Sequence, residues 1–184
     1  MLPLMIAKNL ELFWEQQKAS RRNFVLCSGE QIFARIDFTS AFSTLADAKS
    51  GGEHWTLKRV GCLSSQVTIR RVGSVVNLAT YHPNWTGSQG QVRFSTGEIY
   101  NWEVANFWST QYAIHSEDGN ELVTYRFGSK SRKLSNIFKQ QAQVVITPEA
   151  WQLQELPILV LLGWYLIVLQ ADDLAAAATI VVLS

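Results

Sequence analysis

The hydrophobic pattern of the chain changes twice along its length. Between residues 23 and 148, short runs rich in β-branched and aromatic residues recur, separated by Gly, Asn, Asp and Ser. In residues 121–127, for example, apolar Val, Tyr and Phe alternate with Thr and Arg, as in a strand with one buried face. The pattern predicts a β-meander with strands near 23–28, 31–39, 54–60, 66–72, 75–81, 90–95, 98–105, 107–115, 121–127 and 142–147.

Turn sequences between these runs favour antiparallel hairpins. Gly73, Gly97 and Gly119 each lie in a short polar segment between two predicted strands, where a residue that tolerates positive φ is needed. Three longer connections are predicted as loops, at 40–53, 82–90 and 128–139.

The first 22 residues show a different spacing. Leu10, Phe13, Trp14 and Gln17 recur at helical intervals, and charged residues occupy the positions between them. This spacing predicts an N-terminal helical segment within residues 1–22, with a short helix over 4–20.

The segment 156–170 is apolar on every side. Pro157 suits a first helical turn, and the residues from Ile158 to Leu169 are apolar without interruption. At about 1.5 Å per residue these twelve residues reach roughly 18 Å, short of the roughly 30 Å hydrocarbon core. The pattern therefore favours a helix buried in protein, and residues 171–184 form a tail or a last strand. A helical hairpin or membrane anchor over 156–183 is the alternative.

A closed barrel reconciles the meander with this helix. A helix that is apolar all round has to be buried on every side, and a closed sheet of about 10–12 antiparallel strands has room inside for one. We therefore predict a mainly β fold, a single domain over 1–184, in which the 23–148 meander surrounds a central helix. Gly163 would let a strand backbone or a bulky side chain approach that helix closely.

Charge is distributed unevenly along the chain. The 184 residues carry a formal net charge of +1 and only 17% charged residues. Residues 54–148 hold ten Lys and Arg against five acids, whereas 149–184 hold four acids and no base. The composition excludes a disordered chain and a uniformly basic nucleic-acid binder, and we expect no nucleic-acid partner.

Candidate catalytic and metal-binding chemistry is sparse. Cys27 and Cys62 show no zinc spacing and are expected as buried thiols, and His54, His82 and His115 show no metal-ligand spacing. No nucleophile elbow, P-loop or dinucleotide fingerprint occurs in the sequence. We expect a protein that is not an enzyme and that uses neither metal nor cofactor. The N-terminus lacks the features of a secretory signal, so we expect a cytoplasmic protein, with peripheral membrane association as a further option.

A basic connection is the leading candidate for a binding site. Four cations lie within ten residues without an acid between them, and two arginines of a nearby predicted strand add to them. Such a cluster can bind anionic phospholipid head groups, whereas a solvated loop is the alternative. The proposed head-group residues are Lys130, Arg132, Lys133, Lys139, Arg70 and Arg71.

Seven tryptophans could stack on a ligand or fill the core. Core packing is the expected role for at least five of them, because most lie in predicted strands or in the apolar helix. Trp85, in the 82–90 loop, is the one that we expect to be exposed, and an exposed Trp85 would mark a contact surface.

The chain resembles the tubby C-terminal-like superfamily, which includes phospholipid scramblases and LURP-one-related proteins. The resemblance covers roughly residues 23–170 and is carried by residues 55–58, the 95–102 hairpin, residues 112–114 and the apolar run 157–163. It implies a barrel around a central helix and binding of phosphoinositides. The tail 171–184 has no counterpart, and the palmitoylation cluster and proline-rich arm of the scramblases are absent from the sequence, so scramblase activity is not expected.

These observations predict a binding or scaffold module that acts at anionic membranes or on a protein partner. Two alternatives stay open at this point. One is a membrane-associated protein anchored by residues 156–183, and the other is an enzyme with a site in or at the mouth of the barrel.

Overall fold

Twelve β-strands form most of the fold. The computed structural model describes residues 1–61, 65–106, 110–128 and 141–182, with side chains up to Ala178. The strands are β1 (Leu12–Gln16), β2 (Asn23–Ser28), β3 (Gln31–Phe38), β4 (Ala46–Ser50), β5 (Glu53–Val60), β6 (Gln66–Arg71), β7 (Ala79–Pro83), β8 (Gln89–Phe94), β9 (Ile99–Val104), β10 (Gln111–Ser116), β11 (Glu121–Phe127) and β12 (Gln141–Ile146).

The strands close into a barrel. Each strand pairs antiparallel with the next one along the chain, and β12 also pairs with β1. Trp14 of β1 lies opposite Leu26 of β2 on one side and Ala142 of β12 on the other. Closure leaves no free sheet edge. The predicted closed antiparallel barrel is confirmed.

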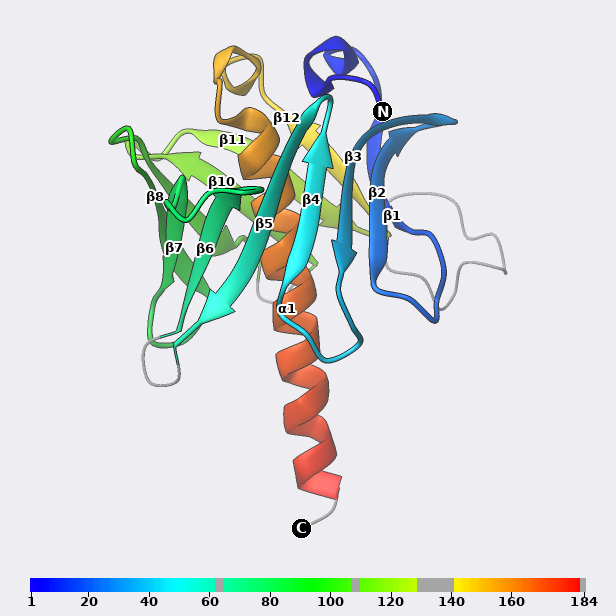
Figure 1. Cartoon of the computed structure of the whole chain (residues 1–184), viewed down its shortest axis with the longest axis vertical. Helices are drawn as coiled ribbons and strands as arrows, with labels where there is room; N and C mark the ends of the chain where they lie inside the picture. The colour runs from blue at the N-terminus through cyan, green and yellow to red at the C-terminus, as the bar shows by residue number, and fades with distance from the viewer. Residues whose placement is uncertain (62–64, 107–109, 129–140, 183–184) are drawn as a thin grey trace.

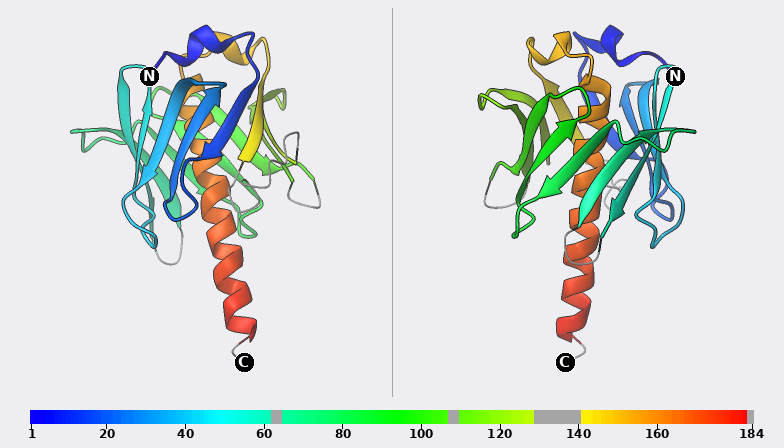
Figure 2. Two further views of the ribbon diagram at one scale, coloured as in Figure 1. Left: turned by 90° about the vertical axis from the view of Figure 1, so that its right-hand side faces the viewer. Right: turned by 60° about the vertical axis from the view of Figure 1, so that its left-hand side comes forward.

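A single helix, α1 (Leu156–Val182), runs through the barrel and extends beyond it (Figures 1 and 2). Between Leu156 and Leu169 nearly every side chain of the helix is buried. The strands direct alternate residues inward on all sides of α1, which explains why its sequence has no polar face. The predicted central helix is confirmed, and it is longer than the predicted 156–170.

Aromatic rings join the helix to the wall. Trp164 of α1 stacks on Trp14 with ring centroids 5.5 Å apart, and Tyr165 stacks on Phe38 at the same distance. Of the six tryptophans that the structure describes, five are buried, as expected for core residues: Trp14, Trp55, Trp102, Trp151 and Trp164. Trp108 lies outside the described residues.

Gly163 permits a close approach of one wall residue. The fully buried Tyr125 of β11 donates a hydrogen bond from its hydroxyl to the Val160 carbonyl oxygen (2.9 Å). A Cβ on Gly163 would overlap the ring and hydroxyl of Tyr125. The expected close approach at Gly163 is confirmed, with Tyr125 as the bulky partner.

The N-terminal prediction is wrong in its secondary structure. In place of a helix over 4–20, the chain forms a short 3-10 helix, η1 (Leu4–Ala7), and then strand β1. Leu12 and Trp14 both face the interior, a two-residue period that pairing with β2 and β12 stabilises. The helical spacing of Leu10, Phe13 and Trp14 is coincidental, since Leu10 is exposed.

Two further segments differ from the prediction. Residues 171–182 continue α1 and form no last strand, because β12 already pairs with β1 and the barrel has no vacant edge. The predicted 40–53 loop contains β4, whose small residues Ala46, Ala48 and Ser50 face the interior. Strand β7 begins at Ala79, later than predicted, and residues 107–109 of the predicted 107–115 strand lie outside the described residues.

The barrel has two different ends. Helix α1 enters at the end where η1 and η3 (Ala150–Gln152) lie, which we name the entry end (Figure 1). It leaves at the opposite end, which we name the exit end. Because the strands alternate in direction, every second connection lies at each end.

Candidate functional site

The exit end is the most distinctive surface of the molecule by charge. Six connections join strands there: 17–22, 39–45, 61–65, 84–88, 105–110 and 128–140. Their sequences contain Lys and Arg but no Asp or Glu. Residues 62–64, 107–109 and 129–140 of these connections lie outside the described residues, so only their sequence is considered.

The entry end has the opposite charge. Its connections and the N-terminal segment carry one lysine, Lys8, and seven acids. The acids are Glu11, Glu30, Glu98, Glu117, Asp118, Glu149 and Glu155. The molecule is therefore polarised along the barrel axis, a feature that the net charge of +1 conceals.

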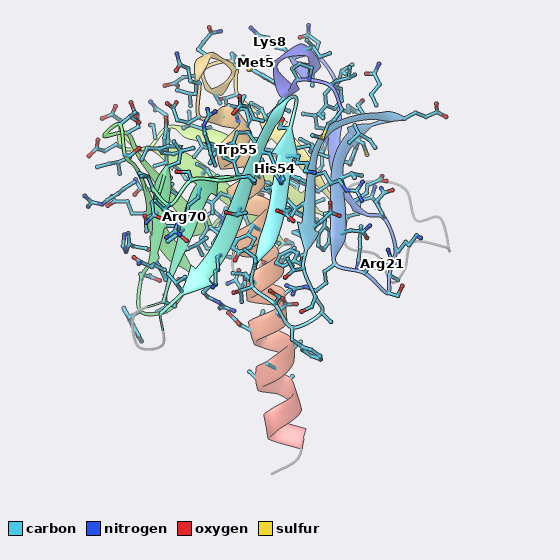
Figure 3. The ribbon with its side chains drawn as sticks, in the orientation of Figure 1. Met5, Lys8, Arg21, His54, Trp55 and Arg70 are labelled. Carbon is cyan, nitrogen blue, oxygen red and sulfur yellow. The ribbon has the colours of Figure 1, made fainter. Side chains whose placement is uncertain are left out.

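Two of the exit-end cations point to solvent and one points to the helix. Lys18 and Arg21, in the β1–β2 connection, are exposed. Figure 3 shows Arg21 at the exit end and Met5 and Lys8 at the entry end. Arg22 is half-buried and donates hydrogen bonds to the Ala41 and Ser43 carbonyl oxygens (3.1 and 2.8 Å).

Two ion pairs hold α1 where it leaves the barrel. Arg22 pairs with Asp172, and its guanidinium lies 3.8 Å from the centroid of the Phe38 ring. Arg59 of β5 forms a bidentate pair with Asp173, with N–O distances of 2.7 and 2.9 Å. The acids missing from the exit-end connections are thus supplied by the helix, and each is already neutralised by an arginine of the wall.

The pKa of one group in each pair is shifted, by burial in Asp172 and by hydrogen bonding in Arg59. Desolvation raises the pKa of Asp172 above its ordinary value, although the Arg22 guanidinium acts in the opposite direction. The hydrogen bond to Asp173 raises the pKa of Arg59, which stays charged. The two pairs therefore lie in a partly desolvated rim, where ion pairs are screened less by salt than in open solvent.

Large apolar side chains project from the same end. Phe42 in the β3–β4 connection is 99% exposed, Trp85 in the β7–β8 connection is 96% exposed, and Leu174 of α1 is 61% exposed. Beyond Leu174, Ala175–Ala178 are also exposed. The predicted exposure of Trp85 is confirmed. Trp85 and Leu174 line the same hollow, and large exposed apolar side chains at one end of a protein can mark an interaction surface.

The entry end also exposes apolar residues, but of another kind. Nine exposed large aliphatic side chains lie in the N-terminal segment, the β2–β3 hairpin and the β6–β7 connection: Met1, Leu2, Met5, Ile6, Leu10, Ile32, Val72, Val75 and Val76. They are accompanied by the acids of that end and by no described exposed aromatic residue. This end therefore serves as an internal comparison for the exit end.

The predicted head-group residues divide into two groups. Arg70 lies on the outer wall of the barrel (Figure 3). It donates a hydrogen bond to Asn77 Oδ1 (2.7 Å). Arg71 forms an ion pair with Glu53 (2.8 Å). Both lie where β6 approaches the entry end, and each has its own partner. The other four predicted residues, Lys130, Arg132, Lys133 and Lys139, lie outside the described residues.

His54 lies by itself on the outer surface, whereas His82 and His115 line one hollow of the outer wall together with Glu103. His54 Nε2 is 3.3 Å from Asp47 Oδ1, and His115 Nε2 is 3.2 Å from Glu103 Oε1. Within the described part of the chain, no group of three or more His, Cys, Asp or Glu side chains is placed to hold a metal ion.

Cys27 is a buried free thiol, as expected, and burial raises its pKa to about 11. Cys62 lies outside the described residues.

Sequence reasoning missed three features of the exit end: Phe42, the two ion pairs and the absence of acids from its connections. The first two require the fold, because Arg22 and Asp172 are 150 residues apart in the chain. The absence of acids could have been predicted from the sequence, because every second connection of a meander lies at the same end. This rule would have placed the acids of the predicted turns together at one end of the barrel.

Searches against family models, curated proteins and solved structures found no match. Among the described helices, Leu156–Ala178 is long and apolar enough to cross a bilayer, but 67% of its apolar stretch is buried inside the barrel. That burial accounts for the apolar residues up to Leu169, whereas Leu174 to Ala178 are exposed.

Proposed function

We propose that this protein is a non-enzymatic binding module that docks its exit end on an anionic membrane surface. The observation that carries the proposal is the coincidence of three features at one end of the barrel. These are the exposed aromatic residues Phe42 and Trp85, the projecting apolar end of α1, and six connections that contain no acid, two of which (17–22 and 128–140) hold seven cations.

Each feature has a role at a bilayer. Aromatic side chains favour the membrane interface, where their rings leave water at the head-group level. A lysine or arginine near an anionic leaflet contributes about 1 kcal/mol to binding. Lys18 and Arg21 are exposed at this end. The sequence adds Lys130, Arg132 and Lys133 in the connection between β11 and β12.

The end of α1 is suited to shallow insertion. From Leu174 to Val182 it extends by about 13 Å, less than half of the roughly 30 Å hydrocarbon core. Asp172 and Asp173, held by the wall arginines, lie where this segment begins. We therefore propose that the barrel rests on the membrane with the helix end in the interface, in a peripheral arrangement.

The geometry supports this arrangement over the other two possibilities. An anchor formed by all of 156–183 would require the barrel to release a helix that supplies twelve buried hydrophobic residues at its centre. An enzyme would need convergent reactive groups, whereas His82 and His115 share only an open hollow of the outer wall, in which His115 is paired with Glu103. The resemblance to tubby-like domains, which bind phosphoinositides, supports binding at a membrane.

Vesicle flotation tests the proposal. The wild-type protein should float with vesicles containing phosphatidylserine and should remain unbound with phosphatidylcholine alone. The double variant Lys18→Glu/Arg21→Glu should lower the partition coefficient at least about 30-fold, because two contributions of about 1 kcal/mol each are lost. The double variant Phe42→Ser/Trp85→Ser should bind weakly at every lipid composition.

A matched control lies at the entry end. Val75→Ser/Val76→Ser removes two exposed apolar side chains there and should leave flotation unchanged. The triple variant Lys130→Glu/Arg132→Glu/Lys133→Glu tests the cations known from sequence. Equal flotation of the exit-end variants and the wild type, or loss of flotation in the entry-end variant, would contradict the proposal.

A further inference from the structure

Exposed aliphatic side chains gather around η1 at the entry end. Leu2, Met5, Ile6 and Leu10 are all more than a third exposed, and Figure 3 shows Met5 at this end of the barrel. Ile32 of β3 joins them, because the backbone N–H of Leu2 donates a hydrogen bond to the Ile32 carbonyl oxygen (2.9 Å). We name these five residues the entry cluster. Large apolar side chains that are exposed together can mark a surface that binds another molecule.

A hollow of about 350 Å³ opens beside the entry cluster. Met5 lines it from η1, Gly52 from the β4–β5 hairpin and Ile158 from the first turn of α1. Glu53 and Arg71 also line it, and their side chains form an exposed ion pair (2.8 Å). The hollow is large enough for one apolar side chain of a partner, and protein interfaces commonly place such an anchor in a pocket.

Two acids next to the entry cluster have no partner among the described residues. Glu11 directly follows Leu10 in the chain, and Glu30 precedes Ile32 by two residues. Both acids are exposed, and no described residue forms a hydrogen bond or an ion pair with either carboxylate. Lys8 is the one lysine of the entry end, so the seven acids there leave an excess of negative charge. The surface is therefore complementary to apolar side chains that are flanked by Lys or Arg.

The closed sheet limits how a partner can bind. Because β12 pairs with β1, a partner strand finds no free edge to extend. An amphipathic helix needs no such edge, since it lays its apolar face on the surface and keeps its charged residues at the borders.

The other possible occupants fit the entry cluster less well. The acids of the entry end repel an anionic membrane. In a second copy of this chain, the cationic end carries the projecting segment of α1 from Leu174 to Val182, about 13 Å long. This segment would hold the cations of the second copy away from the cluster.

We propose that the entry end docks a cationic amphipathic helix of a partner protein. One apolar side chain of that helix occupies the hollow beside Met5, and its other apolar side chains contact Ile6, Leu10 and Ile32. Its Lys or Arg side chains pair with Glu11 and Glu30. This docking surface goes beyond the membrane proposal and does not rest on it. In the membrane-docked arrangement the entry end faces away from the bilayer, so the barrel can hold both partners at once.

Fluorescence anisotropy with two labelled peptides tests this surface. The peptide LKKLLKLLKKLLKL forms a cationic helix with leucines on one face, and the wild-type protein should bind one equivalent saturably. The peptide SKKSSKSSKKSSKS keeps the charge and lacks the apolar face. It should bind at least about tenfold more weakly, because the apolar contacts are lost.

Two variants locate the binding. A Cβ at Gly52 would meet no atom within 4 Å, and the φ of Gly52 lies outside the left-handed region. Gly52→Trp therefore places a large side chain over the hollow without strain and should weaken binding of the leucine peptide about 30-fold. Gly52→Leu is the smaller replacement if the first variant does not fold. Glu11→Lys/Glu30→Lys should weaken binding about tenfold, because two attractive contacts become repulsive.

Matched controls lie at the same end, outside the entry cluster and the hollow. Asn120→Trp adds the same large side chain in the β10–β11 turn, and Glu98→Lys/Glu117→Lys reverses two other acids. Both should bind the leucine peptide like the wild type at physiological salt, where exposed charges more than about 8 Å apart are largely screened. No saturable binding by the wild type, equal affinity for the two peptides, or unchanged affinity in folded Gly52→Trp or Glu11→Lys/Glu30→Lys would each overturn the proposal.

A second copy as the occupant has its own signature. Sedimentation velocity of the protein alone should show a monomer. Self-association that Gly52→Trp abolishes would assign the surface to a second copy and overturn the proposal.

Failure of this surface is distinguishable from failure of membrane docking. Gly52→Trp should float with anionic vesicles like the wild type. Phe42→Ser/Trp85→Ser should bind the leucine peptide like the wild type, because both residues lie at the opposite end of the barrel.

Discussion

Gly163 shows how a single missing side chain sets the contact between helix and wall. The hydroxyl of Tyr125 reaches the Val160 carbonyl oxygen only because position 163 has no Cβ. Gly163→Ala should lower the free energy of unfolding by about 1–3 kcal/mol, the usual cost of overpacking a core. Denaturant titration measures the change.

Gly52 provides the matched control for this substitution. A Cβ at Gly52 would have no neighbour within 4 Å, so Gly52→Ala should change stability little. A Gly163→Ala variant as stable as Gly52→Ala would contradict the proposed role of Gly163.

The buried thiol of Cys27 should make the free energy of unfolding depend on pH. Burial, assisted by the nearby Glu15 carboxylate, raises the pKa of this thiol from 9.0 to about 11. Above pH 9 the unfolded chain therefore loses the proton more readily than the native protein, so stability falls as pH rises. Compared with Cys27→Ala, the wild-type protein should lose stability between pH 9 and 10. Chemical denaturation at each pH measures this difference.

The pH window is chosen to separate Cys27 from the buried tyrosines. Burial raises the pKa of Tyr100 to about 12 and that of Tyr125 well above its ordinary value of 10.0, so these tyrosines affect stability only as the pH passes about 10. Cys62 is present in both proteins and cancels. A constant stability difference between wild type and Cys27→Ala from pH 8 to 10 would show that the Cys27 thiol is solvated in the native state.

At the scale of elements, α1 is the core of the barrel. Leu162 is fully buried at the centre of the helix, so Leu162→Asp places a carboxylate among apolar side chains with no partner. We expect this variant to lose soluble expression or cooperative unfolding, as judged by circular dichroism.

Ala176→Asp is the control for α1 outside the barrel. It introduces the same charge where the helix is exposed, and it should fold normally. A folded and soluble Leu162→Asp protein would contradict the buried-helix structure.

The elements differ in how well their sequences predict them. Strands such as β11 and the apolar part of α1 were predictable, because their period or composition reflects burial directly. Strands β1 and β4 were not. β1 is short and its apolar residues also fit a helical period, whereas β4 contains the small residues Ala46, Ala48 and Ser50, which carry little hydrophobic signal. Their assignment requires the pairing partners that close the barrel.

At the scale of the molecule, the important property is the separation of positive and negative charge between the two ends of the barrel, which no single segment shows. The cations of the exit end and the acids of the entry end come from connections spread over the chain, and only the alternation of strand direction sorts them. Phe42 also lies in a predicted loop, 40–53, but its exposure was not predicted, since apolar Ala41 and Leu45 accompany it there. The exposure of Trp85 was predicted, because it lies in a loop rich in Asn, Thr, Gly and Ser.

The orientation of the barrel on a membrane can be measured directly with an environment-sensitive fluorophore. In a Cys62→Ser background, the buried Cys27 should not be labelled, so a single nitrobenzoxadiazole group can be attached at Phe42→Cys or at Val75→Cys. These positions are exposed at the exit end and the entry end, respectively.

On addition of vesicles containing phosphatidylserine, the label at position 42 should show a blue shift and a rise in emission, and the label at position 75 should show neither. A response at position 75, an equal response at both positions, or no response at position 42 would contradict docking through the exit end.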